Sequence, residues 1–185
     1  MMVADSTVEY ILRQAQLVVG ESALLIASPS FSSLINKEFT GRQVGRIEKA
    51  ATAPRRAMRI GAVVYHNKHF VTFTAERDGV GAHVQVWDSM KLYLQAHRLQ
   101  LAKKFKQAVE IWWKLPTVAD DEPEPCFQQA ADSNDCAMHA MSRAISFCLN
   151  RQVTIDRAVL ASMSRSPTDD RELLTRLQLR ASSQT

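Results

Sequence analysis

The sequence predicts an α+β protein with a mixed or antiparallel sheet at its centre and helices around it. Apolar residues recur at the spacing of an amphipathic helix near the start, in the middle and in the last third of the chain. Three consecutive segments between the first two of these are rich in β-branched and aromatic residues. The 185 residues are 46% hydrophobic and 23% charged, as in ordinary globular proteins, so we expect one domain over residues 1–185.

The first predicted helix covers residues 7–19 and begins behind the cap candidates Asp5 and Ser6. A short apolar strand follows at residues 23–27, and Pro29 with the serines around it marks a turn. The apolar stripe of the helix consists of Val8, Ile11, Leu12, Ala15 and Val18.

Residues 37–57 are polar, and we interpret them as loop with some helix. Three strands rich in β-branched and aromatic residues come next, at residues 60–65, 69–75 and 83–88.

Helical spacing returns after the strands. The pattern predicts helices over residues 92–109, over residues 135–149 and, after Pro167, over residues 168–180. The second of these has the clearest apolar stripe, which we expect to be buried: Ala137, Met138, Met141, Ala144, Ile145, Cys148 and Leu149.

The dipeptide Asp78-Gly79 is a strong signal for a two-residue hairpin turn. Such a turn places His69 directly opposite Asp88, on the same face of the sheet, with Cβ atoms about 5 Å apart. At that separation a carboxylate can hold an imidazole in one tautomer. A bulge at Gly81 is the alternative that would shift this register.

Cys136 follows three residues that often cap helices, Ser133, Asn134 and Asp135, at the start of a predicted helix. Helix N-termini favour the thiolate, so Cys136 is a candidate nucleophile. The cysteines number three, the other two being Cys126 and Cys148, and none has the close Cys or His spacing of a zinc site.

Free thiols in a reducing compartment fit this cysteine usage best. No apolar run approaches the length of a membrane span, and the acidic start is unlike a signal peptide, so we expect an intracellular protein of the cytoplasm or nucleus. The formal net charge is +4, with basic stretches at residues 42–59 and 91–106. Neither is dense enough to predict specific nucleic-acid binding.

Each candidate residue also has an ordinary explanation. His69 fits a plain strand histidine, Asp88 a cap before the next helix, and Cys136 a small buried hydrophobe. Taken singly, those explanations are the more common ones. The conjunction of His, Asp, Gln and Cys in this order favours a thiol protease instead.

These residues resemble the ubiquitin-like-specific (Ulp, SUMO-deconjugating) cysteine peptidases, with the adenovirus protease as a more distant relative. His69-Phe70 is similar to the family's His-Trp, and residues 84–90 are similar to its strand ending in Asp-Ser-Leu. Residues 128–136 resemble its box from Gln-Gln to Asp-Cys-Gly, and residues 5–27 resemble its opening helix and strand.

The resemblance implies a papain-like fold of the Ulp type, with the nucleophile at a helix N-terminus. It makes Cys136 the nucleophile, His69 the general base and then acid, and Asp88 the residue that orients His69. Gln129 would complete the oxyanion hole, although Gln128 is an alternative donor because the box is one residue longer than usual. The implied reaction needs no metal or cofactor.

The substrate implied is a ubiquitin-like modifier (SUMO, NEDD8 or ubiquitin type) or a polyprotein, cut at a peptide or isopeptide bond by a monomeric enzyme away from membranes. Phe70 and Asp5 are the candidate substrate-binding residues. Phe70 replaces the family's Trp, Ala137 replaces its Gly, and residues 2–5 lack a second Trp. These departures concern the substrate tail more than the chemistry.

Two other functions remain open. One is a catalytically inactive pseudo-peptidase that binds a ubiquitin-like protein, and the other is a YopJ-like acetyltransferase that forms an acetyl-cysteine with a similar His-acid-Cys order. The acid within Trp87-Asp88-Ser89 favours a peptidase over the acetyltransferase, and candidates at all four catalytic positions argue against an inactive protein.

Overall fold

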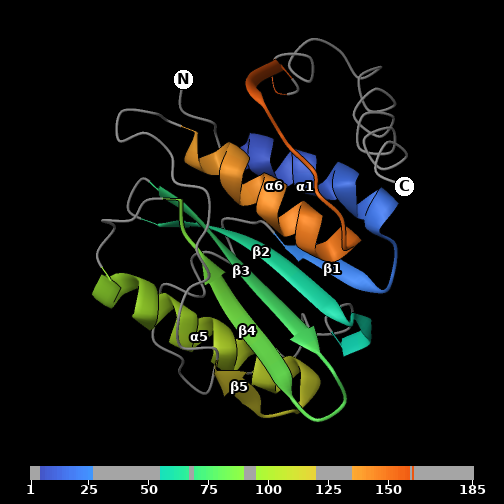
Figure 1. The fold of residues 1–185 in the computed structure, drawn as a ribbon, viewed down its shortest axis with the longest axis vertical. Helices are drawn as coiled ribbons and strands as arrows, with labels where there is room; N and C mark the ends of the chain where they lie inside the picture. Colours follow the sequence, from blue (N-terminus) through green and yellow to red (C-terminus); the bar gives the residue numbers. More distant parts are fainter. Residues whose placement is uncertain are drawn as a thin grey trace.

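The computed structural model describes residues 5–26, 55–66, 69–89, 95–119, 135–158 and 160. Within them one mixed sheet has the strand order β1-β2-β3-β4-β5, with the two inner pairings antiparallel and the two outer pairings parallel (Figure 1). The α+β prediction is therefore confirmed. The strands are β1 (Ala23–Ile26), β2 (Arg59–His66), β3 (His69–Arg77), β4 (Ala82–Trp87) and β5 (Thr117–Ala119).

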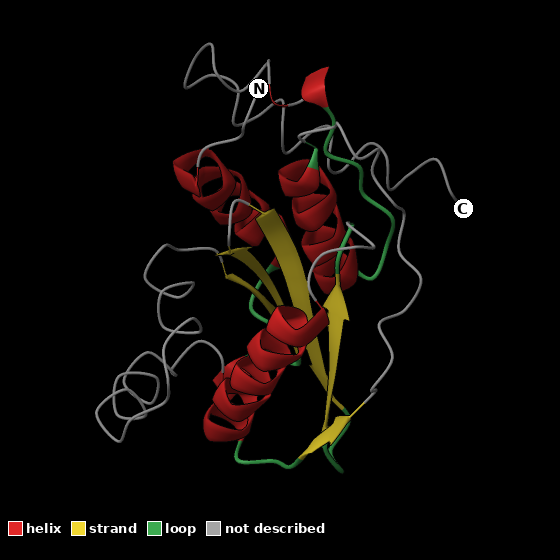
Figure 2. Cartoon of the chain, turned by 90° about the vertical axis from the view of Figure 1, so that its left-hand side faces the viewer, coloured by secondary structure: helices red, strands yellow, loops and turns green. Residues whose placement is uncertain are grey.

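Helices cover both faces of this sheet (Figure 2). On one face α1 (Asp5–Val19) and α6 (Cys136–Leu149) lie side by side, with α6 packed on β1, β2 and β3. On the other face α5 (Gln95–Trp113) packs on β3, β4 and β5. The half of the sheet formed by β4 and β5 is thus left largely uncovered by α6.

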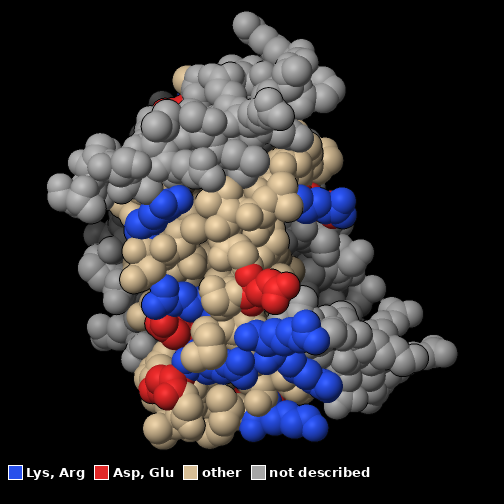
Figure 3. All heavy atoms as spheres, turned by 90° about the vertical axis from the view of Figure 1, so that its right-hand side faces the viewer, with Lys and Arg blue, Asp and Glu red and all other residues tan. Residues whose placement is uncertain are grey.

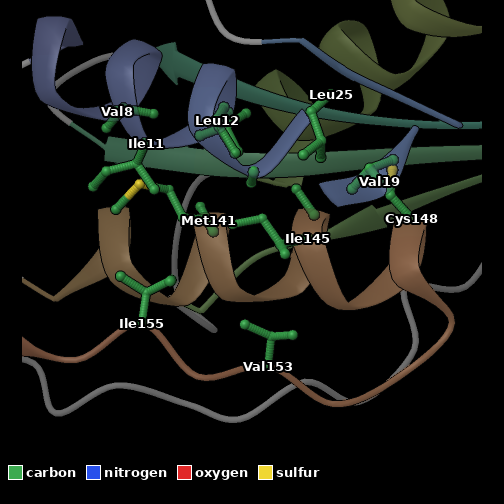
Figure 4. Packing of buried hydrophobic residues seen from close by; sticks show 14 of the residues in the cluster. Val8, Ile11, Leu12, Val19, Leu25, Met141, Ile145, Cys148, Val153 and Ile155 are labelled. Carbon is green, nitrogen blue, oxygen red and sulfur yellow. The ribbon is translucent and has the colours of Figure 1, made fainter. Parts of the chain in front are cut away.

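The predicted apolar stripes form the contact between α1 and α6. Ile11 and Leu12 of α1 face Met141 and Ile145 of α6, and all four side chains are buried (Figure 4). A second core lies on the opposite face, between the sheet and α5, and includes Phe73 and Phe105. Their ring centroids are 5.2 Å apart.

Gly61 lets α6 approach the sheet closely. A Cβ atom at this position of β2 would lie 2.9 Å from the carbonyl oxygen of Ala144 and 3.1 Å from the Cys148 sulfur. Only glycine avoids that overlap. The backbone of α6 therefore lies directly on β2.

The β3–β4 turn differs from the two-residue turn predicted. It contains four residues, because the last facing pair is Arg77 with Ala82. The Asp78 carboxylate explains the longer turn, since Oδ1 accepts hydrogen bonds from the backbone N–H groups of Val80 and Gly81 at 2.9 and 3.0 Å. The predicted register was wrong by two residues.

That error leaves the predicted face unchanged, because side chains alternate with a period of two residues. Thr72 pairs with Trp87, and continuing the same register by one residue sets Asp88 opposite Val71. His69 is two residues from Val71, so His69 and Asp88 are diagonal neighbours on one face instead of a directly opposed pair.

The other predicted elements agree closely with the structure, apart from their ends. The helix predicted over residues 92–109 runs from Gln95 to Trp113, and the three-residue strand β5 had not been predicted. The helix predicted over residues 168–180 and most of residues 37–57 lie outside the described residues. No helix in the described part of the chain is long and apolar enough to cross a membrane.

Charged side chains of both signs mix on the surface. On the face shown in Figure 3, Lys and Arg gather toward one end, with Asp and Glu among them. Ion pairs of this kind include Arg59 with Glu76 at 2.7 Å and Arg13 with Glu9 at 2.6 Å. The first pair is part-buried and the second is exposed. Exposed pairs contribute little to stability, about 0–1 kcal/mol each.

Candidate active site

His69 and Asp88 form a buried pair at one end of the sheet. His69 is the first residue of β3, and Asp88 directly follows the last residue of β4. The imidazole Nε2 and the carboxylate Oδ1 are 2.7 Å apart, and the two residues are only 2% and 3% exposed. A carboxylate at this distance accepts the Nε2 proton and leaves Nδ1 to face a second partner.

Cys136 supplies that partner. It is the first residue of α6, which begins at the end of the sheet where β3 begins (Figure 1). Its half-buried thiol lies near enough to the His69 side chain and to the backbone N–H groups of Phe70 and Ala137 for each of them to lower its pKa. The three residues predicted to act together are therefore brought together.

The pKa values of the pair shift in opposite directions. Burial lowers the His69 pKa, but hydrogen bonds to Asp88 and Cys136 and the charges of both outweigh it and raise that pKa from 6.5 to about 9. Burial raises the Cys136 pKa, but the hydrogen bond from His69 and the Phe70 N–H outweigh it and lower that pKa from its ordinary 9.0. The arrangement favours a thiolate beside an imidazolium.

Cys148, the other described cysteine, has the opposite environment. It lies on the buried stripe of α6, and burial raises its pKa to about 12. Neither cysteine is in a disulfide. Cys126 lies outside the described residues.

The predicted side-chain cap of α6 is wrong for Asp135. Asp135 occupies the N-cap position, but its side chain makes no capping hydrogen bond. Its carboxylate is held instead by Arg157, with Nη2 and Oδ1 2.9 Å apart. The backbone N–H of Ala137, in the first turn of α6, helps to lower the pKa of the Cys136 thiol.

Of the remaining predicted site residues, the structure describes some and leaves others outside its described residues. Gln128 and Gln129 lie outside the described residues, and Asp5 is the first residue of α1. Phe70 is only 4% exposed, packs in the core between the sheet, α1 and α6, and has its ring centroid 4.8 Å from that of Tyr65. Ala137, where the family has Gly, is buried in the same core.

A cavity of about 1160 Å³ adjoins Asp88 on the α6 side of the sheet. Phe70, Trp87 and Arg143 are among its lining residues. Arg143 had not been singled out from the sequence, although its position seven residues after Cys136 puts it on the same side of a helix. No group of His, Cys, Asp and Glu in the described ranges could hold a metal ion.

Comparison with known proteins finds relatives at the level of structure. No protein-family model matches the chain, and no curated protein sequence matches it. The yeast Ulp1 protease domain, solved in complex with Smt3, the yeast ortholog of SUMO, is 14% identical with a TM-score of 0.64, over 95% of this chain and 77% of that chain. The effector XopD of Xanthomonas campestris, bound to ubiquitin, is 13% identical with a TM-score of 0.63, over 94% and 90%.

A further similar structure is Ulp1 with its catalytic cysteine oxidized to a sulfenic acid, at 13% identity and a TM-score of 0.64. It covers 94% of this chain and 78% of that chain. Identities this low establish the fold alone. The chain has the fold of the Ulp-type cysteine proteases, as its sequence motifs predicted.

Proposed function

We propose that this chain is a cysteine peptidase that cleaves a peptide or isopeptide bond at the C-terminus of a ubiquitin-like protein. The observation that carries the proposal is the contact of Cys136 with His69, whose Nε2 is 2.7 Å from Asp88 Oδ1. A thiolate paired with a buried imidazolium is the reactive form that thiol proteases use. The ubiquitin-bound and Smt3-bound relatives support this class of substrate.

In the acylation step the Cys136 thiolate attacks the carbonyl carbon of the scissile bond, and the carbonyl electrons move to oxygen. His69 then donates its proton to the leaving amine as the C–N bond breaks, which leaves a thioester on Cys136. In deacylation His69 takes a proton from water, whose oxygen attacks the thioester. The carboxylic acid product and the Cys136 thiolate are released.

Asp88 acts on His69 without making or breaking a bond. Its carboxylate holds the Nε2 proton, so that Nδ1 exchanges the catalytic proton with the thiol and the leaving group. Gln129 is our candidate for the side-chain donor to the oxyanion, together with backbone N–H near Cys136. Gln128 is the alternative donor.

The proposal is tested with a panel of ubiquitin-like proteins that carry a C-terminal electrophile. The expected result is a covalent adduct on Cys136 with at least one member and none with Cys136→Ala. Tight binding without an adduct would indicate the inactive binding protein. A Cys136 acetyl adduct formed from an acetyl-thioester, with no modifier adduct, would indicate the acetyltransferase.

The oxyanion donor is identified by comparing Gln129→Ala with Gln128→Ala. An oxyanion donor acts only in the transition state, so its loss lowers the acylation rate by about 10²–10³-fold and leaves substrate affinity almost unchanged. We expect this for Gln129→Ala. Stopped-flow acylation, with affinity measured on a Cys136→Ser background, separates the two effects, and a loss confined to Gln128→Ala would move the role to Gln128.

A further inference from the structure

The contact between Trp87 and Arg143 joins the strand that carries Asp88 to the helix that carries Cys136. Trp87 is the last residue of β4 and is only 6% exposed. The Arg143 guanidinium carbon lies 3.2 Å from the centroid of its indole ring. At this distance the planar guanidinium lies against the ring face, where both cation–π attraction and stacking contribute.

The indole is also held by a hydrogen bond to the neighbouring strand β3. Trp87 Nε1 donates a hydrogen bond to Thr74 Oγ1 at 3.1 Å, and Thr74 is itself 1% exposed on β3. Both contacts restrain the ring immediately before Asp88. Because Asp88 directly follows Trp87, they restrain the backbone from which the catalytic carboxylate extends.

Arg143 and Cys136 lie on the same side of α6, since seven residues make about two helical turns. Cys136 contacts the start of β3 through His69 and the Phe70 N–H. Arg143 contacts the end of β4 through Trp87. One side of α6 therefore contacts both β3, which carries His69, and the end of β4, which Asp88 directly follows.

We propose that Arg143 is a positioning residue for Cys136, His69 and Asp88, and that its stack on Trp87 holds Asp88 at hydrogen-bonding distance from His69. The inference rests on the proposed function for the roles of those three residues. Misplacement of a catalytic group by about 1 Å can lower a rate 10²-fold. A contact of modest energy can therefore matter more for reactivity than for folding.

The chain offers a matched control for this contact. Arg59 of β2 lies over the ring of Phe147 on α6, with 5.9 Å between its Cζ and the ring centroid. It is also an arginine–aromatic contact between the sheet and α6, but Phe147 is eleven residues beyond Cys136. Arg59→Met removes such a contact without releasing the strand end at Asp88.

The experiment measures the pH dependence of Cys136 alkylation by iodoacetamide, read at that residue by mass spectrometry, together with melting temperature. Wild type is compared with Arg143→Met, Arg143→Lys and Arg59→Met. The titratable residues nearest to Cys136 in the chain, the N-cap residue Asp135 and His139 in the first turn of α6, stay the same in all four proteins.

We expect Arg143→Met to raise the apparent pKa of the Cys136 thiol by about one unit, which slows alkylation about tenfold at pH values below that pKa. Arg143→Lys should do the same, because lysine keeps the charge but cannot stack as a plane. Arg59→Met should lower the melting temperature about as much as Arg143→Met does. It should leave the pH profile of Cys136 alkylation unchanged.

Three outcomes overturn the inference. A wild-type profile in Arg143→Met means that the contact only stabilises the fold, and a wild-type profile in Arg143→Lys means that charge acts without stacking. An Arg59→Met profile shifted as far as that of Arg143→Met means that the effect is not specific to the Trp87 contact. If the Cys136 thiol of the wild type has an ordinary pKa, the proposed function itself is contradicted. This result can be distinguished from the three outcomes above.

Discussion

Thr72 donates its side-chain hydrogen bond to the carbonyl oxygen of Ala140, with 2.8 Å between the two oxygens. Thr72 lies three residues after His69 in β3, and Ala140 lies four residues after Cys136 in α6. Both residues line the cavity beside Asp88, and the bond ties the strand that carries His69 to the helix that carries Cys136. It is fully buried, so water cannot replace it.

Thr72→Val should lower the free energy of unfolding by about 1 kcal/mol, because valine has the same shape but no hydroxyl donor. The alkylation rate of Cys136 should fall as well, since α6 loses a fixed point near the site. Urea denaturation measures the first effect and iodoacetamide kinetics the second. Thr7→Val, at a half-buried position in the first turn of α1, should change neither by much.

Gly61→Ala should destabilise the protein by about 1–3 kcal/mol, because the added methyl group overlaps the Ala144 carbonyl oxygen and α6 must move away from β2. Thermal unfolding measures this cost. The control is Gly20→Ala, where no atom lies within 4 Å of the new methyl but φ is +75°. Its cost of about 1 kcal/mol comes from backbone strain alone and should leave Cys136 reactivity intact.

Cys136 should be the cysteine that reacts first. Its pKa is lowered, whereas burial raises the Cys148 pKa to about 12. Limiting iodoacetamide at neutral pH, followed by peptide mass spectrometry, should find the label on Cys136 and leave Cys148 unmodified in the folded protein. Preferential labelling of Cys148 or Cys126 is the result that contradicts this assignment.

Asp88→Asn should lower turnover by about 10²-fold or more with little change in folding, because the amide no longer fixes the imidazole tautomer. The His69 pKa should fall from about 9 toward 6.5, since the hydrogen bond to Asp88 and the charge of Asp88 contribute most to raising it. Histidine NMR titration follows that pKa directly. Full activity in Asp88→Asn is incompatible with the proposed pair.

The unfolding free energy should depend less on pH in the wild type than in Cys136→Ala between about pH 6.5 and 9. The raised His69 pKa contributes stability that is fully present below pH 6.5 and is lost as pH rises through about 9. The lowered Cys136 pKa contributes stability that is present above pH 9.0 and is lost as pH falls through the folded value.

In the wild type these two contributions oppose each other, because folding moves a proton from the thiol to the imidazole. Cys136→Ala removes the contribution of the thiol and keeps the part of the rise in the His69 pKa that Asp88 causes, so its unfolding free energy should decline as pH rises above 6.5. Denaturation of both proteins at pH 6, 7, 8 and 9 measures the difference. Parallel curves for the two proteins would count against a thiolate–imidazolium pair.

Much of this fold was predictable because it depends on local patterns. The stripes of α1 and α6 follow helical spacing, and the three central strands follow composition. The pairing of His69 with Asp88 was predicted from a turn of the wrong length, and it survived because a two-residue shift keeps each side chain on its face. The three residues of β5 are too few to form a pattern.

The contacts that could not be predicted join residues far apart in the chain. The Asp135 carboxylate binds Arg157 and does not cap α6, although its local sequence is typical of a cap. The stack of Arg143 on Trp87 spans 56 positions of the chain. No periodicity or turn signal encodes either contact, because each depends on how α6 lies on the finished sheet.

The order in which the chain can acquire its reactive thiol follows from the way β2, β3 and β4 are joined. These strands form an antiparallel meander with short connections, so His69 and Asp88 can meet while the rest of the chain is still unfolded. Cys136 meets them only after α6 has been synthesised and has docked. During synthesis the thiol therefore keeps its ordinary pKa, and the lowered pKa is acquired only when α6 docks on the finished sheet.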